Sequence, residues 1–163
     1  MKFWIIISLL LALTNNQAKD ISLSELRDLY IEASLEEDKA NKLYELTKNS
    51  SIESCYKKFT YHVIAILLQC KFSANPIYKL ESFGEGKEQL EKVISQYPKD
   101  IELRFLRLCI QDGTPAILDY KLNMYEDSQF IKNNISTSSE DLQQFIMPIF
   151  KTFNDGRTSY TGK

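Results

Sequence analysis

The sequence predicts an all-α protein, an antiparallel bundle of about six to seven helices that follows a signal peptide. Apolar residues recur at helical intervals along most of the chain, and short segments containing Pro, Gly or Asn separate the periodic stretches. One stretch, residues 101–111, is apolar on almost every side, so it has to pack against several neighbours at once. We therefore expect it to form the central helix of the fold.

The N-terminal segment, residues 1–18, has the layout of a secretory signal peptide. Lys2 provides a basic start, an apolar run extends from Phe3 to Leu13, and a short polar stretch ends at the small residue Ala18. The run is too short for a permanent membrane anchor, and no Cys follows it to carry a lipid. We expect cleavage after Ala18 and export of the protein to the periplasm or out of the cell.

The rest of the chain is expected to form one domain. A length of 163 residues suits a single domain with its own core, and no linker or low-complexity stretch divides it. We assign residues 19–156 to a single all-helical domain and residues 157–163 to a frayed C-terminal tail.

Two short helices are expected at the start of this domain. Ser22 with Glu25, and Ser34 with Glu37, have the spacing of a capping box, in which a hydroxyl and a carboxylate satisfy free backbone N–H groups. Apolar residues on one face follow each pair. The two helices should therefore meet at a tight corner near Ser34.

The next helix is predicted over residues 52–72, which contain the continuous apolar run VIAILL. A buried strand is the alternative, and the β-branched residues Val63 and Ile64 favour it. The polar residues in the segment, such as His62 and Gln69, do not alternate with apolar ones as a strand requires. We therefore predict a helix.

Glycines interrupt the region that follows. We expect residues 77–83 to form a short turn, broken by Gly84 and Gly86, before a helix over residues 87–97. Leu90 and other apolar residues lie on one face of that helix.

The central helix has clear boundaries in the sequence. Pro98 cannot continue the preceding helix, and the carboxylate of Asp100 can accept the free N–H groups of the next first turn. Gly113 and Pro115 end it. Beyond it we expect an irregular connection over residues 114–123, a short helix over 124–131 and a polar loop over 133–139. A last helix should then cover residues 138–153, capped by Ser138 with Asp141 and interrupted by Pro148.

Two arginines form a polar stripe on the otherwise apolar central helix. Arg104 and Arg107 are three residues apart and so share one face. In one interpretation their guanidinium groups pair with nearby acids such as Glu102, Glu126 or Asp127 while their stems cover apolar surface. In the other, they bind a carboxylate or phosphate of a partner together with a neighbouring aromatic residue; the candidate binding residues are Arg104, Arg107 and Tyr120.

Motifs of catalysis and of metal binding do not stand out in the sequence. The only histidine is His62, and its position beside an apolar run is typical of a core or rim residue. The cysteines show no Cys-x-x-Cys spacing, so we expect buried free thiols, with a bridge from Cys109 to Cys55 or Cys70 left open. We assign no catalytic residue, no metal ligand and no cofactor.

The charge balance argues against nucleic acid as a partner. The chain has 20 basic and 22 acidic residues and a net charge of −2, whereas nucleic-acid binding needs a basic surface.

The segment from Leu90 to Leu108 resembles the junction between two tetratricopeptide repeats. Leu90, Val93 and Pro98 match that family's spacing for an aromatic residue, a small residue and a helix-ending Pro, although Val93 is not small and no second copy of the repeat is visible. The whole chain is also similar to small exported helical proteins of Gram-negative bacteria that carry the Glu-Leu-Arg-Phe-Leu-Arg helix, here Glu102 to Arg107. These resemblances imply a fold and a compartment, and no reaction.

Three functions remain open at this point. The favoured one is an exported module that binds a protein or peptide partner on a tetratricopeptide-like face. The others are an enzyme built around His62 and nearby acids, and a carrier that holds a small ligand in an apolar cavity between helices. The oligomeric state is not predicted.

Overall fold

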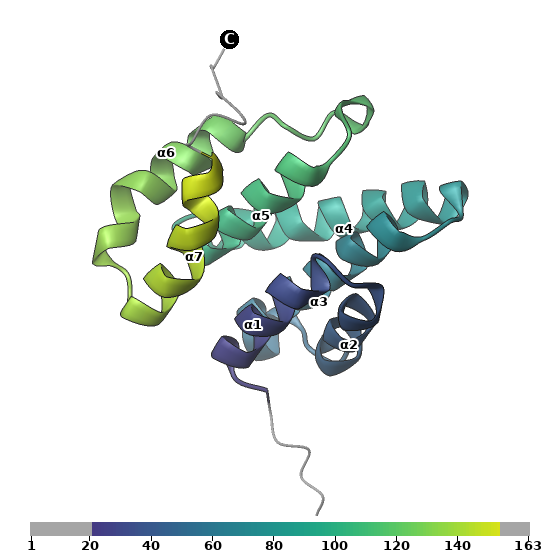
Figure 1. Cartoon of the computed structure of the whole chain (residues 1–163), viewed down its shortest axis with the longest axis horizontal. Helices are drawn as coiled ribbons and strands as arrows, with labels where there is room; N and C mark the ends of the chain where they lie inside the picture. Colours follow the sequence, from purple (N-terminus) through teal and green to yellow (C-terminus); the bar gives the residue numbers. More distant parts are fainter. Residues whose placement is uncertain (1–20, 154–163) are drawn as a thin grey trace, which may run out of the picture.

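The computed structural model describes residues 21–153, and this part of the chain is entirely helical, with no strand (Figure 1). The predicted all-α class is therefore confirmed, including the helix that was predicted against a strand at residues 52–72. Seven α-helices and two 3₁₀ turns follow one another: α1 (Leu23–Ala33), α2 (Glu37–Thr47), α3 (Ile52–Phe72), α4 (Pro76–Gln96), α5 (Ile101–Gly113), η1 (Ala116–Leu118), α6 (Met124–Asn134), η2 (Ile135–Thr137) and α7 (Glu140–Thr152).

The helices pack antiparallel in two groups on either side of α4 (Figure 1). Helices α1 and α2 pack against α3, and α3 packs along the long helix α4. Helices α5, α6 and α7 form the other group, in which α5 contacts α3, α4, α6 and α7. This is the central position predicted for residues 101–111.

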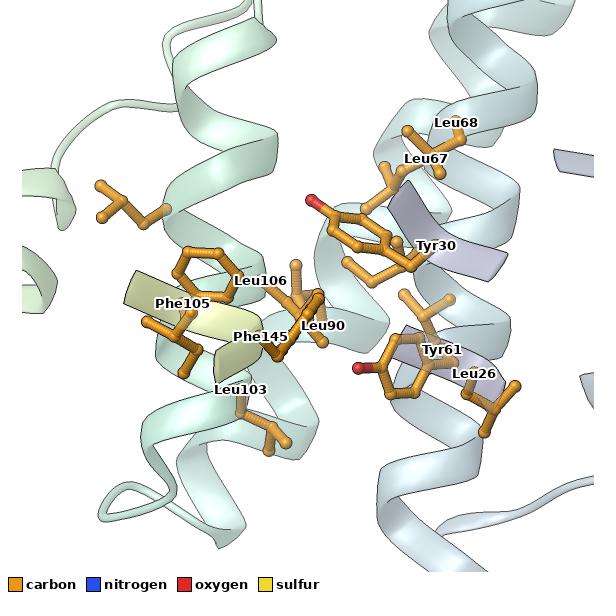
Figure 2. Close-up of a cluster of buried hydrophobic side chains, with 14 of the residues drawn as sticks. Leu26, Tyr30, Tyr61, Leu67, Leu68, Leu90, Leu103, Phe105, Leu106 and Phe145 are labelled. Atoms are coloured by element: carbon orange, nitrogen blue, oxygen red, sulfur yellow. The ribbon is translucent and has the colours of Figure 1, made fainter. Parts of the chain in front are cut away.

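The two groups share one hydrophobic core. Figure 2 shows the ring of Phe145 from α7 close to Phe105 of α5 and to Tyr30 of α1. Phe145 makes edge-to-face contacts with Phe105, at 5.4 Å between ring centroids, and with Tyr30, at 6.0 Å. Such edge-to-face pairs add to the stabilisation from burial. The last helix therefore seals the core between the two groups.

Some predicted helix starts are confirmed and others are wrong. Ser22 and Glu25 form a capping box, and Asp100 accepts the N–H groups of Glu102 and Leu103. Ser34 instead ends α1, where its hydroxyl donates to the carbonyl of Ile31, and α2 begins at Glu37 without a side-chain cap. The predicted cap at Ser138 is also wrong, because α7 begins at Glu140 after Ser139, so Asp141 is too close to its start. Likewise, helix α6 and η2 occupy most of the predicted loop.

The predicted turn at residues 77–83 and the break at the two glycines are wrong. Helix α4 runs without interruption through Gly84 and Gly86. A Cβ atom on Gly86 would lie 2.8 Å from Cδ2 of Leu67, so this glycine lets α3 and α4 approach closely. Packing between the helices outweighs the poor helix propensity of the two glycines.

Candidate functional site

The arginine stripe is bound to acids of the chain itself. Arg107 is buried, and its Nε and Nη2 donate to the two carboxylate oxygens of Asp127, each at 2.7 Å. Its Nη1 donates to Glu91 at 2.6 Å. Burial by itself lowers the pKa of Arg107, but the hydrogen bonds and charges of Asp127 and Glu91 outweigh it and raise that pKa above its usual value. Each of the three guanidinium nitrogens of Arg107 therefore donates to a carboxylate of the chain.

Arg104 shares the same acids. Its Nη1 donates to Glu126 and to Asp127, at 2.9 Å each, and its Nε donates to the carbonyl of Pro98 at 2.7 Å. Its guanidinium also lies 4.3 Å from the ring centre of Phe130. The interpretation that the arginines pair with Glu126 and Asp127 is confirmed.

Tyr120, the third candidate binding residue, lies in the same cluster. Its side chain is buried, and its hydroxyl donates to Glu91 at 2.5 Å. Burial and the carboxylate of Glu91 raise the pKa of Tyr120 well above its usual value. The structure thus brings the three candidate residues together around Glu91 and Asp127, where they tie α4, α5, α6 and the 114–123 connection to one another. Their contact with a partner remains a prediction.

A second polar cluster lies at the first turn of α5, on a different face of the helix from the arginine stripe, and the sequence did not indicate it. Glu102 is fully buried and accepts two hydrogen bonds from Arg27, at 2.8 and 2.9 Å. The hydroxyl of Tyr61 donates to it at 2.7 Å and Nζ of Lys57 at 3.0 Å. Burial alone raises the pKa of Glu102, but Arg27, Lys57 and Tyr61 together lower it below its usual value. Glu102 pairs here, and not with the arginine stripe.

An apolar cleft lies where several helices end. It has a volume of about 380 Å³ and is lined by the C-terminal ends of α1, α3 and α5, the first half of α4, and the segment 113–118. The chain passes round the cleft because Gly113 and Pro115 end α5 there. Most of the lining is apolar and comes from residues such as Tyr30, Leu67, Leu68, Phe83, Ile110 and Leu118. A volume of this size is at the small end of the range, about 300–1,000 Å³, that is usual for ligand sites.

The charged side chains that line this cleft are both lysines, Lys71 and Lys79. Nζ of Lys71 donates to the carbonyl of Ser34 at 2.7 Å and lies 5.3 Å from the ring centre of Phe72. Lys79 is exposed, and its ammonium group forms no ion pair or hydrogen bond within residues 21–153. The cleft therefore combines an apolar interior with a free positive charge.

Two cysteines line the same cleft as neutral thiols. Burial raises the pKa of Cys70, and it raises the pKa of Cys109 to about 12. At neutral pH they are therefore poor nucleophiles and poor metal ligands. All three cysteines are free, but the prediction that all are buried holds only for Cys70, because Cys109 is half-buried and Cys55 is exposed at the start of α3.

His62 lies outside the cleft. Its ring stands against Tyr44, at 5.0 Å between centroids, and Phe59, at 6.3 Å, and its Nδ1 is buried without a hydrogen-bond partner in the described structure. Burial lowers the pKa of His62, so the ring is neutral at neutral pH. Within residues 21–153, no group of three or more His, Cys, Asp or Glu side chains is placed to hold a metal ion. Nor does this part of the chain contain a helix long and apolar enough to cross a membrane.

Comparisons with protein-family models, with curated proteins and with solved structures found no match to the chain. The structure shows an all-helical protein with an apolar cleft. In the sequence, the cleft is marked only by Gly113 and Pro115, which end α5 beside it.

Proposed function

We propose that this protein is a binding protein, without a catalytic role, that holds a small apolar ligand in the cleft between α1, α3, α4 and α5. The observation that supports this most is the cleft itself, a hollow of about 380 Å³ with a mostly apolar lining. The groups that line it suit binding more than chemistry, because the raised pKa values of Cys70 and Cys109 keep both thiols protonated. We also propose that the protein acts after export, as its N-terminal sequence predicts.

A protein or peptide partner is the second candidate. Two apolar side chains beside the cleft are strongly exposed, Leu80 of α4 at 64 % and Ile117 of η1 at 90 %. They are next in sequence to the lining residues Lys79 and Leu118, so a partner that placed one side chain in the cleft would also cover them. The tetratricopeptide-like segment, residues 90–108, contributes no residue to the lining of the cleft, so the binding face would lie next to it. The stripe of Arg104 and Arg107 is the weaker location, since both are already paired with acids.

Filling the cleft with a side chain tests the proposal. Gly113 lines the cleft, and a Cβ atom on it would meet no atom within 4 Å, so we expect the indole ring of Gly113→Trp to occupy the cleft. A fluorescent naphthylamine dye without charge should bind the unmodified protein, and the variant should weaken its binding by about tenfold or more, equivalent to ~1.4 kcal/mol.

Gly84→Trp is the matched control. Gly84 is also exposed and also has open space around its Cβ position, but it does not line the cleft. It should leave dye binding unchanged, and thermal unfolding should show both variants to be folded. Absence of dye binding, or equal binding by both variants, would rule out the cleft as the ligand site.

A further inference from the structure

We propose that the ligand of the cleft is an anionic amphiphile, with a single alkyl chain in the apolar interior and a carboxylate or similar singly charged head group at Lys79. This rests on the proposed binding function and adds the chemical class of the ligand.

The charges around the cleft carry the first part of the inference. The chain as a whole has more acidic than basic residues, 22 against 20, yet both charged side chains that line the cleft are lysines. An apolar molecule without a charged head would gain nothing from these two ammonium groups. A positively charged one would be repelled by them. An anionic head group is the complement of this opening.

Lys79 differs from Lys71 in being available. The ammonium group of Lys71 is held by the carbonyl of Ser34 at 2.7 Å. Lys79 has no such partner within residues 21–153, although its charge acts on the interior of the cleft: it lowers the pKa of the Cys70 thiol, against the larger effect of burial, which raises it. Because Lys79 also lines the cleft, we expect its ammonium group to meet the head group of a bound molecule.

The position of Lys79 on its helix strengthens the positive potential. Lys79 lies in the first turn of α4, which contains no acidic residue. The side chain of Asn75 caps the N–H groups of Ile77 and Tyr78, and the helix dipole adds a partial positive charge at this end. A lysine at that position is unfavourable for the helix alone. An anionic ligand would relieve this unfavourable interaction.

The size and lining of the cleft define the apolar part of the ligand, which lies away from the head group. A volume of about 380 Å³ is enough for one alkyl chain and too small for a two-chain lipid. Leu67, Phe83 and Ile110 are among the side chains that would surround it. Burial of such a chain contributes most of the affinity, about 0.8 kcal/mol for each buried methylene group.

Three molecules with the same alkyl chain and different head groups test the inference: dodecanoate, dodecanol and dodecylamine. Each is measured by displacement of the uncharged dye at neutral pH, below the concentration at which the amphiphile aggregates. Dodecanoate should bind about fivefold more tightly than dodecanol, the size expected of a partly exposed ion pair, and dodecylamine should bind most weakly. Added salt should reduce the preference.

Variants of one lysine locate the head group. Lys79→Gln should remove the preference for dodecanoate over dodecanol, Lys79→Arg should keep it, and the distant exposed Lys151→Gln should have no effect. Equal binding of dodecanoate and dodecanol, or a preference that survives Lys79→Gln, would overturn the inference while leaving the binding function intact. Failure of the dye and of all three amphiphiles to bind would overturn the binding function as well. If Gly113→Trp does not weaken the preferential binding of dodecanoate, the alkyl chain lies outside the cleft, and the inference is refuted as well.

Discussion

The two glycines of α4 offer a direct test of how closely α3 and α4 approach. Both lie inside the helix, two residues apart, but they face different surroundings. A Cβ on Gly84 would meet nothing within 4 Å, whereas a Cβ on Gly86 would lie 2.8 Å from Cδ2 and 2.9 Å from Cγ of Leu67. Leu67 is itself buried, so it has little room to move away. Alanine at the two positions should therefore have opposite effects.

The expected magnitudes follow from two known contributions. Replacing Gly by Ala inside a helix stabilises it by about 0.5–1 kcal/mol, and this applies to both positions. At Gly86 the added methyl group also overpacks the interface, which costs about 1–3 kcal/mol. We expect Gly84→Ala to raise the free energy of unfolding by about 0.5–1 kcal/mol and Gly86→Ala to lower it by up to about 2 kcal/mol.

Urea unfolding followed by far-ultraviolet circular dichroism measures both variants under one set of conditions. The difference between them, about 1–3 kcal/mol, isolates the overpacking because the helix contribution cancels. Equal stabilisation by both substitutions would refute the close contact of α3 with α4. Destabilisation by Gly84→Ala would instead indicate that α4 is broken at this glycine.

Two further predictions concern two buried acids, Asp127 of α6 and Glu102 of α5. Asp127→Asn leaves the buried guanidinium of Arg107 without its main counter-charge and should lower the free energy of unfolding by about 3–5 kcal/mol. Glu126→Gln changes an exposed acid and should alter that free energy by less than about 1 kcal/mol. Similar urea midpoints for the two variants would contradict this account. The second is a pH dependence: the pKa of Glu102 is lower in the folded protein than its ordinary value of 4.5, so its ion pairs stabilise the fold fully above that pH and lose this contribution as the pH falls through the folded-state pKa. Thermal unfolding between neutral and acidic pH should therefore show a steeper loss of stability below about pH 4.5 for the unmodified protein than for Glu102→Gln, and parallel curves would exclude Glu102 as a source of the acid sensitivity.

Local sequence signals account for most of the helices. The lack of alternation in residues 52–72 was enough to predict α3, and Asp100 between Pro98 and an apolar run was enough to place the start of α5. Both signals, the pattern of polar residues and the cap at a helix start, depend on residues close together in the chain, so they can be recognised in the sequence.

What could not be predicted depends on contacts between distant segments. Whether a glycine breaks a helix or lets another helix approach depends on the residue opposite, and for Gly86 that residue is Leu67 of another helix. The pairing of Arg27 with Glu102 joins residues 75 positions apart. The pairing of Arg104 and Arg107 with Glu126 and Asp127 matches one of the two interpretations of the stripe that the sequence allowed. The cleft is formed by the ends of four helices, and no periodicity describes a space between elements.

The two polar clusters fix the orientation of α5 about its own axis. Residues 101–111 are all buried or half-buried, so apolar packing alone would discriminate poorly between different rotations of this helix. Glu102 must meet Arg27, and Arg107 must meet Asp127, each through two directed hydrogen bonds. If α5 rotated about its axis, or shifted along it by one helical turn, both ion pairs would break and their charges would remain buried without a partner. We therefore expect the two ion pairs to specify a single register and orientation of α5. A chain with Met or Leu at all four positions should lose its unique packing before it loses its helices.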